Sequence, residues 1–224
     1  LKKLEKLPAL LQILPNIREV HVTIDEISLP ELDLRWVEPL AHLTKFFLRC
    51  FNHYWSLEEI SSLFKVLPIV EQLSLQISSQ DSSFVHCERE LFNLLPKSVQ
   101  EFNFSLRYYY ESVDEIDRQA LLTARFPMVC LLDDELDQAV IHTIPYRFPL
   151  LNITTRMAKQ MASADNYRTL EKFYDYQGMS LAETLPIVTR AARIHELDIQ
   201  CDKTETTASS RCAKTGRIFL IWHS

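Results

Sequence analysis

The chain has 224 residues, of which 47% are hydrophobic and 24% are charged, and its formal net charge is −6. This composition predicts a packed globular protein and excludes a disordered chain. The acidic balance and the lack of a Lys/Arg-rich run argue against nucleic acid as a partner, because binding it depends on neutralising phosphates. No stretch approaches the roughly 18 consecutive apolar residues of a membrane span, so we expect no membrane partner.

An apolar triplet recurs along the chain at intervals of 22 to 29 residues. Its form is apolar, two variable residues, apolar, one variable residue, apolar, and the alternating second half is typical of a β-strand. The triplets are Ile17/Val20/Val22, Leu43/Phe46/Leu48, Val70/Leu73/Leu75, Val99/Phe102/Phe104, Phe126/Val129/Leu131, Phe148/Leu151/Ile153, Leu170/Phe173/Asp175 and Ile194/Leu197/Ile199. Such a period predicts a solenoid, in which each repeat buries its apolar face only against its neighbours.

Helix-start signals recur between the triplets. Ser56, Ser112 and Ser180 are each followed three residues later by Glu, the pattern of a capping box, and each lies 17 residues before the middle residue of the next triplet. Ser28 adds a fourth such start. Three-and-four spacing then predicts amphipathic helices over Ile60/Leu63/Phe64/Leu67, Ile116/Ala120/Leu121/Ala124, Leu136/Ala139/Val140 and Leu181/Leu185/Val188/Ala191.

The predicted unit is a strand, a loop, a capped helix and a turn. Successive strands joined by helices pair in parallel, so we expect an α/β solenoid with a curved parallel sheet on the concave side and helices on the convex side. About eight irregular repeats occupy residues 1–201, a polar loop or linker follows over 202–216, and 217–224 form a ninth strand or the start of a further repeat. The helix-like pattern at Leu1 indicates a piece of a longer protein.

Catalytic and metal-binding signals are weak. The five cysteines are odd in number and form no Cys-x-x-Cys pair, so we expect reduced thiols, no metal and an intracellular protein, cytoplasmic or nuclear. Only two glycines are present, which argues against a Gly-rich phosphate loop, and no hydrolase or kinase signature appears. The run Asp133-Asp134-Glu135 fits either a carboxylate site or acids at a helix N-terminus, and we favour the second. We therefore expect no enzyme and no cofactor.

The segments Leu40-x-x-Leu43-x-x-Phe46-x-Leu48 and Leu67-x-x-Val70-x-x-Leu73-x-Leu75 resemble the strand half of the leucine-rich repeat. The resemblance covers roughly residues 1–200 and implies a horseshoe fold. Within that family the chain is most similar to the substrate-recognition portion of F-box proteins, although no F-box lies within it. The family places Asn or Cys three residues after the triplet to link neighbouring repeats, whereas this chain has Phe51, Ser78 and Arg107 at three of these positions.

The resemblance implies a non-catalytic protein–protein interaction module that serves as the substrate-binding arm of an F-box ubiquitin ligase of the SCF type. Its ligase adaptor would bind a domain outside this chain. One alternative is an intracellular scaffold or inhibitor of the same fold without a ubiquitin link. A second alternative, from another class, is an enzyme on an irregular α/β fold.

Residues interleaved with the triplets should point to the concave face, because side chains alternate along a strand. Aromatic and Arg side chains are enriched at protein interfaces, which makes the large interleaved residues candidates for partner contact. The candidates on this face are His21, Phe47, Arg49, Asn103, Tyr174, Tyr176 and Asp198. Tyr108, Tyr109 and Tyr110 lie on the rim before a capping Ser and serve either rim packing or partner contact, while Trp55 is predicted to pack as a hydrophobic staple.

Overall fold

The computed structural model describes residues 6–13, 16–24, 34–35, 37–86, 90–161, 166, 172–175 and 196–199. The chain divides into two compact units. The first comprises Leu1–Cys130 and Asp134–Thr143, and the second comprises Leu131–Asp133 and Ile144–Ser224.

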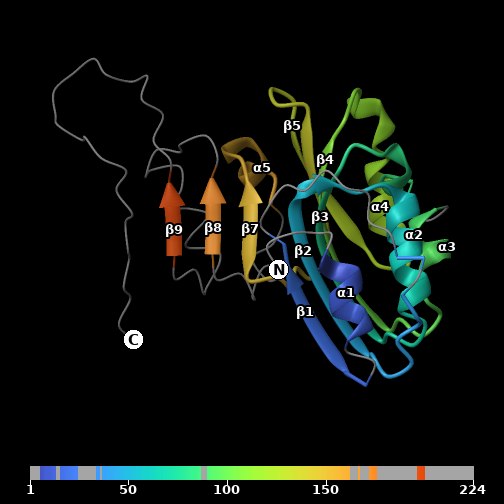
Figure 1. The fold of residues 1–224 in the computed structure, drawn as a ribbon. Coiled ribbons are helices and arrows are strands. Elements are labelled where there is room, and N and C mark those ends of the chain that lie inside the picture. Colours follow the sequence, from blue (N-terminus) through green and yellow to red (C-terminus); the bar gives the residue numbers. More distant parts are fainter. Residues whose placement is uncertain are drawn as a thin grey trace, which may run out of the picture. The chain divides into compact units, whose positions relative to one another are not determined.

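Most of a six-stranded sheet lies in the first unit, and its strand order is β1-β2-β3-β4-β6-β5 (Figure 1). Its strands are β1 (Glu19–Thr23), β2 (Lys45–Tyr54), β3 (Gln72–Ser79), β4 (Glu101–Tyr109), β5 (Met128–Asp133) and β6 (Gln138–Thr143). The first four strands pair in parallel with their sequence neighbours. This run is the parallel stack that the triplets predict.

The apolar triplets of the first four strands lie in register. Val20 pairs with Phe46, Phe46 with Leu73, and Leu73 with Phe102. All four side chains are at most 5% exposed. Because a shift of one residue would turn this apolar row to the opposite face, its burial fixes the register of the stack.

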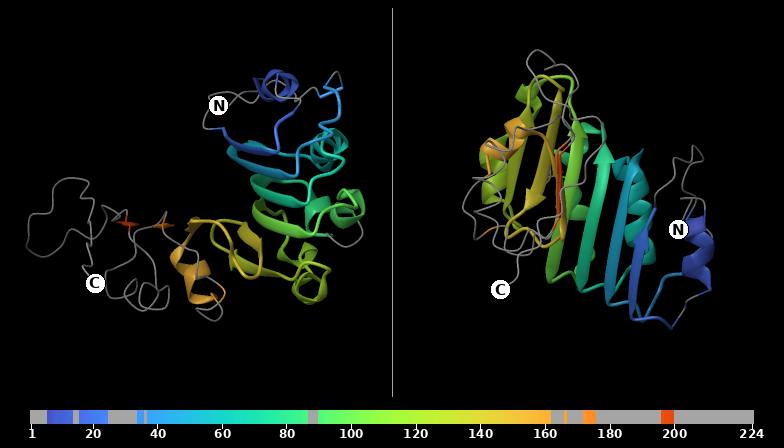
Figure 2. Two further views of the ribbon diagram at one scale, coloured as in Figure 1. Left: turned by 90° about the horizontal axis from the view of Figure 1, so that it is seen from below. Right: turned by 90° about the vertical axis from the view of Figure 1, so that its left-hand side faces the viewer.

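Helices cover one face of the four parallel strands (Figures 1 and 2). They are α1 (Leu7–Gln12), α2 (Leu57–Val66), α3 (Leu91–Leu94) and α4 (Arg118–Thr123), with short 3₁₀ turns at η2 (Ser82–Phe84) and η3 (Val113–Glu115). The longest of them, α2, begins with the predicted capping box of Ser56 and Glu59. It buries Ile60, Leu63 and Phe64, so its predicted start and apolar face are both confirmed.

The predicted continuation of the parallel sheet beyond β4 is wrong. β6 pairs antiparallel with β4 and separates it from β5, so Val129 does not lie on a strand next to Phe102. The predicted helix over Leu136, Ala139 and Val140 is instead the turn and strand of a hairpin. All six residues of β6 are buried, so its sequence lacks the alternation of apolar and polar residues that marks a half-buried strand. Its Val, Ile and Thr nevertheless favour a strand over a helix.

The acidic run Asp133-Asp134-Glu135 also differs from its predicted place. It ends β5 and enters the hairpin turn and does not begin a helix, because only four residues separate β5 from β6. Asp137 completes the turn with a φ of 48°, a left-handed conformation that Asp tolerates better than most residues. The predicted capping box of Ser112 and Glu115 is present, but it begins the 3₁₀ turn η3, and Asp117 caps α4.

A three-stranded parallel sheet forms in the second unit. Its elements are β7 (Leu150–Ile153), α5 (Thr155–Lys159), β8 (Lys172–Asp175) and β9 (Glu196–Ile199). Leu151 pairs with Phe173 and Phe173 with Leu197, so the middle residues of the last three triplets are again in register. The predicted helix starts at Ser28 and Ser180, the linker over 202–216 and the strand over 217–224 lie outside the described residues.

The structure therefore shows a mixed α/β fold whose main sheet is parallel over four strands and antiparallel at its hairpin. Over the described part of the chain, no helix has the length and apolar character needed to cross a membrane.

Candidate functional site

The candidate site is the face of β1–β4 that lies opposite the helices, which we call the strand face. The burial pattern of β2 alternates, with Phe46, Leu48 and Cys50 buried and the intervening side chains wholly or partly exposed. Among the described helices of the first unit, none covers this second face (Figure 2). Interleaved residues of all four strands lie on this face; His21, Phe47, Ser74 and Asn103 are exposed or half-buried, whereas Gln76 and Ser105 further along β3 and β4 are buried.

Two of the predicted residues stack on each other. His21 on β1 and Phe47 on β2 are register partners, and their ring centroids are 5.3 Å apart with an interplanar angle of 21°. The Nε2 atom of His21 lies 2.8 Å from a carboxylate oxygen of Glu19. On the other side of the same row, the Asn103 amide donates to the Ser74 hydroxyl at 3.1 Å and to Glu101 at 3.2 Å. The row is therefore aromatic at β1 and β2 and polar at β3 and β4.

Arginine and aromatic side chains gather further along the same strands. Arg49 and Arg107 place their guanidinium carbons 5.7 and 5.1 Å from the centroid of the Phe51 ring. Tyr54 and Tyr109 meet edge to face with centroids 5.4 Å apart. We call these five residues the arginine–aromatic cluster. All five belong to the first unit, and Tyr54 is 54% exposed while the others are partly exposed.

A small residue on the intervening strand allows the cluster to form. Ser78 of β3 pairs with Arg107 of β4 and is buried, and its hydroxyl donates to the carbonyl of Phe51 at 2.9 Å. The short side chain lets Arg107 reach across β3 to Phe51. The Ser78 hydroxyl thus links two neighbouring strands as a donor.

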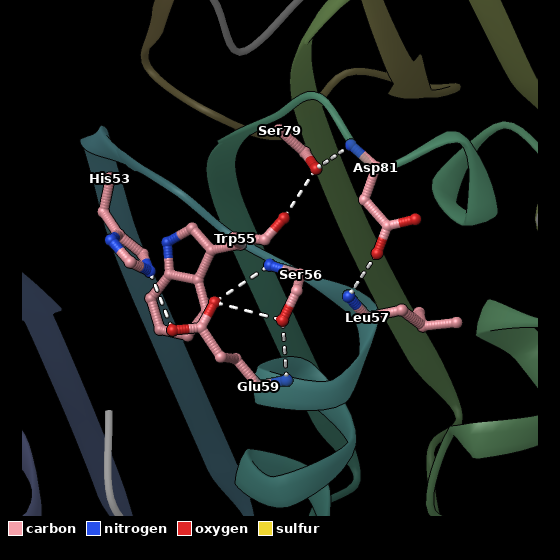
Figure 3. Close-up of polar contacts among 7 residues, drawn as sticks. All are labelled: His53, Trp55, Ser56, Leu57, Glu59, Ser79 and Asp81. Atoms are coloured by element: carbon pink, nitrogen blue, oxygen red, sulfur yellow. Dashed lines mark hydrogen bonds and ion pairs between the residues drawn. The ribbon is translucent and has the colours of Figure 1, made fainter. Parts of the chain in front are cut away.

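Next to the cluster along the chain, a network of hydrogen bonds connects the end of β2 to the start of α2 (Figure 3). The Ser56 amide donates to Glu59 at 2.9 Å, and His53 Nε2 lies 2.9 Å from the other carboxylate oxygen of Glu59. Burial raises the pKa of Glu59, but the hydrogen bonds from His53 and Ser56 outweigh it, so this pKa lies below its ordinary value. The negative charge at the helix start is thereby retained near neutral pH.

Residues at the end of β3 and just after it complete this network. A carboxylate oxygen of Asp81 accepts from the backbone amide of Leu57 at 2.8 Å, and Ser79 donates to the carbonyl of Trp55 (Figure 3). Trp55 itself is 1% exposed, in agreement with its predicted packing role. The segment that carries Tyr54 is therefore anchored by the next repeat, which holds the cluster in place.

The rim tyrosines divide between two roles. Tyr108 and Tyr110 are 1% and 7% exposed, which favours rim packing over partner contact, the two roles that the sequence left open for them. The Tyr108 hydroxyl donates to Glu115 at 2.7 Å and the Tyr110 hydroxyl to Asp134 at 3.2 Å. Burial and the hydrogen bond to Glu115 raise the pKa of Tyr108 well above its ordinary range. Only Tyr109, on the alternate side of β4, reaches the strand face.

The remaining predicted residues belong to the second unit. Tyr174 pairs with Asp198 and with Asn152, so three interleaved positions form a row across β7, β8 and β9. For Tyr174 and Asp198 the structure describes the backbone, and Tyr176 lies outside the described residues. The binding prediction for these residues stays a prediction.

Three members of the cluster were missing from the predicted site. Phe51, Tyr54 and Arg107 stand in the sequence only as parts of rim runs, beside a capping Ser. Their meeting depends on the register between β2 and β4, which are not neighbours, and on a bulge in the pairing of β2 between Cys50 and Tyr54. The sequence signal that could have indicated this contact is an aromatic run in one repeat followed by an Arg-Tyr run two repeats later.

Thiols and carboxylates are not gathered into a reactive centre among the described residues. Burial raises the pKa of Cys50 to about 11 and that of Cys130 to about 12, which keeps both thiols protonated near neutral pH. Within the described part of the chain, no group of three His, Cys, Asp or Glu side chains is placed to hold a metal ion.

Comparison of the chain with protein-family models, with curated proteins and with solved structures gives no match.

Proposed function

We propose that the chain is a non-catalytic protein-binding module and that its strand face contacts the partner. The observation that carries this proposal is the arginine–aromatic cluster, in which side chains from β2 and β4 converge on a face that no described helix of the unit covers. Aromatic and Arg residues are the types enriched at protein interfaces and among their energetic anchors. Phe47, stacked on His21, extends the same surface toward β1.

Rigidity supports the same proposal. The cluster stands on paired strands whose buried rows fix the register, so little conformational entropy is lost when a partner docks. The polar network from Ser56 to Asp81 further fixes the segment around Tyr54. A preorganised surface of this kind is more effective for binding than a mobile loop.

The finer form of the proposal follows from the sequence resemblance. In that form the fold is a leucine-rich-repeat solenoid, the strand face is its concave side, and the chain is the substrate-binding arm of an F-box ubiquitin ligase in the cytoplasm or nucleus. The in-register triplets of β1–β4 and of β7–β9 support this form. A scaffold or inhibitor without a ubiquitin link is the alternative within the same fold.

The test is capture of partners from cell extract by the wild-type chain and by a Phe47→Ala/Tyr54→Ala/Tyr109→Ala variant. We expect the variant to lose partners that the wild type retains, with a loss of at least about 1 kcal/mol for each true anchor. Lys65→Ala on α2 and Arg118→Ala on α4, both at exposed positions, are matched controls that should bind normally. Retention of the partner by the triple variant would contradict the proposal.

The ubiquitin link has its own test in the full-length protein. If the F-box form is right, that protein recovers the adaptor and cullin of a ubiquitin ligase, whereas the present chain recovers only the substrate. A full-length protein free of ligase subunits would leave the scaffold or inhibitor in its place.

A further inference from the structure

We infer that the strand face binds a basic segment of the protein partner at the start of its strands, with a Lys or Arg side chain of that segment paired to Glu101. This inference rests on the proposed function, and it adds the chemistry of the partner and the part of the face that the partner contacts. Two observations support it. The start of the strands is the exposed part of this face, and the Glu101 carboxylate there is held in place by a neutral side chain.

The strand face is accessible on all four parallel strands only at their start. Two register rows there consist of exposed or half-buried side chains, and we call these eight residues the open rows. They are Glu19, Lys45, Gln72 and Glu101 in the first row, and His21, Phe47, Ser74 and Asn103 in the second. Further along β3 and β4, the same face is buried at Gln76, Ser78 and Ser105. A partner that lies across all four strands therefore contacts the open rows.

Glu101 is the anchor for a cation in the open rows. Its carboxylate accepts a hydrogen bond from the Asn103 amide at 3.2 Å, and the same amide donates to the Ser74 hydroxyl at 3.1 Å. Asn103 thus orients an exposed carboxylate without neutralising its charge. In the described part of the chain, no Lys, Arg or His side chain forms an ion pair with Glu101. A carboxylate that is oriented in advance loses little entropy when an incoming Lys or Arg pairs with it.

The other charged residues of the first row do not take the place of that cation. His21 lies within hydrogen-bond distance of Glu19, and this bond together with the charge of Lys45 holds the pKa of Glu19 below its ordinary value. Lys45 stands two strands from Glu101, roughly 10 Å across the sheet, which is about a Debye length in dilute salt. The formal net charge of −6 also favours the approach of a basic partner. Glu101 is therefore the point of the row at which a cation is best received.

The stacked pair of His21 and Phe47 supplies an apolar contact in the second row. The Phe47 ring is half-buried, whereas the His21 side chain is 64% exposed. Flat rings of this kind accept an aromatic or aliphatic side chain. Phe47 and Glu101 lie two strands and one row apart, about 12 Å, a span that about four residues of an extended segment cover. We therefore expect the partner segment to carry a Lys or Arg close to an apolar or aromatic residue.

The test selects binders from a random-peptide display library on the immobilised wild-type chain and titrates the recovered peptides in solution. Peptides whose binding is weakened by Phe47→Ala are the strand-face binders. Among them we expect enrichment of Lys and Arg near an apolar residue, and a Kd that rises with added salt, because salt screens exposed charges. Glu101→Lys should raise their Kd at least about tenfold, and Glu101→Gln should raise it by a smaller factor. Glu58→Lys makes the same charge change at an exposed position on α2 and should leave the Kd within about twofold.

A charge swap tests the pairing itself. Each Lys or Arg of a strand-face binder is replaced by Glu, one position at a time. At one position the replacement should weaken binding to the wild type and restore binding to Glu101→Lys, within about threefold of the original Kd, because the two side chains are in contact. Thermal unfolding of each variant shows whether it remains folded, and Glu101→Gln serves where the charge reversal does not.

Several outcomes would overturn the inference. They are strand-face binders without enrichment of Lys or Arg, an unchanged Kd for a folded Glu101 variant, a charge swap that restores no binding, and a selection that yields no strand-face binder. The proposed function would still stand if the Phe47→Ala/Tyr54→Ala/Tyr109→Ala variant loses its partner from cell extract. The failure of the inference and the failure of the proposed function are thus distinguishable.

Discussion

Ser78 shows how a single side chain serves both the fold and the surface. Its hydroxyl satisfies the Phe51 carbonyl at 2.9 Å, which a buried backbone group requires, and its small size leaves room for Arg107 to reach Phe51. In the sequence, Ser78 stands only as a departure from the Asn or Cys of the leucine-rich repeat, so its donation to the Phe51 carbonyl was not predicted. The approach of two side chains from the strands on either side was not predicted either, because it depends on three-dimensional register.

His142 carries a residue-scale prediction about pH. This side chain is fully buried on β6, and burial lowers its pKa from 6.5 to about 4, although its contact with the Thr143 carbonyl opposes the shift. Below pH 6.5 the His142 imidazole is protonated in the unfolded chain but stays neutral in the folded chain until the pH approaches 4. The free energy of unfolding should therefore decrease as the pH falls from about 6.5 to about 4, by at most about 3 kcal/mol, and should be unaffected by this group above that range.

Denaturant unfolding at several pH values measures this dependence. His142→Gln should reduce the slope between pH 6.5 and 4, whereas His42→Gln, at an exposed position, should preserve it. An unchanged slope in a folded His142→Gln variant would show that the buried imidazole is not its source.

At the scale of elements, the strands and α2 were predictable because their signals are redundant. α2 combines a capping box, an apolar stripe and Pro68 just after its end, and β1–β4 repeat one apolar spacing. The β5–β6 hairpin was missed because β6 is buried at every position and thus lacks alternation. Three apolar residues at helical spacing were too few to distinguish a helix from a buried strand.

Leu73 on β3 and Ser56 at the start of α2 give an element-scale prediction. Leu73 is completely buried in the central row of the stack, so Leu73→Ala should lower the free energy of unfolding by roughly 2–5 kcal/mol through the cavity it leaves. Ser56 accepts from the Glu59 amide at 3.2 Å, and Ser56→Ala should cost about 1 kcal/mol.

Urea unfolding of both variants, with Lys65→Ala as an exposed control, gives the comparison. Equal losses at Leu73 and Ser56 would argue against the assignment of one to the core and of the other to a helix cap.

At the scale of the whole molecule, periodicity predicted one continuous parallel sheet, whereas the described strands form two separate sets of in-register parallel strands. Equal spacing of Val129 with the earlier triplets concealed a change of topology, since a strand inserted by a hairpin leaves the apolar interval unaltered. Alternation likewise predicted that His21, Phe47, Arg49 and Asn103 share one face. Which of them meet aromatic or arginine partners could be read only from the assembled sheet.

Site-specific photo-cross-linking tests the central claim, that the strand face binds the partner, most directly. A photoreactive phenylalanine analogue replaces Phe47 or Tyr109 on the strand face, and Lys65 or Arg118 on the helices, one position at a time. The account predicts covalent capture of the partner from positions 47 and 109 and none from positions 65 and 118. Capture from the helix positions alone would contradict it.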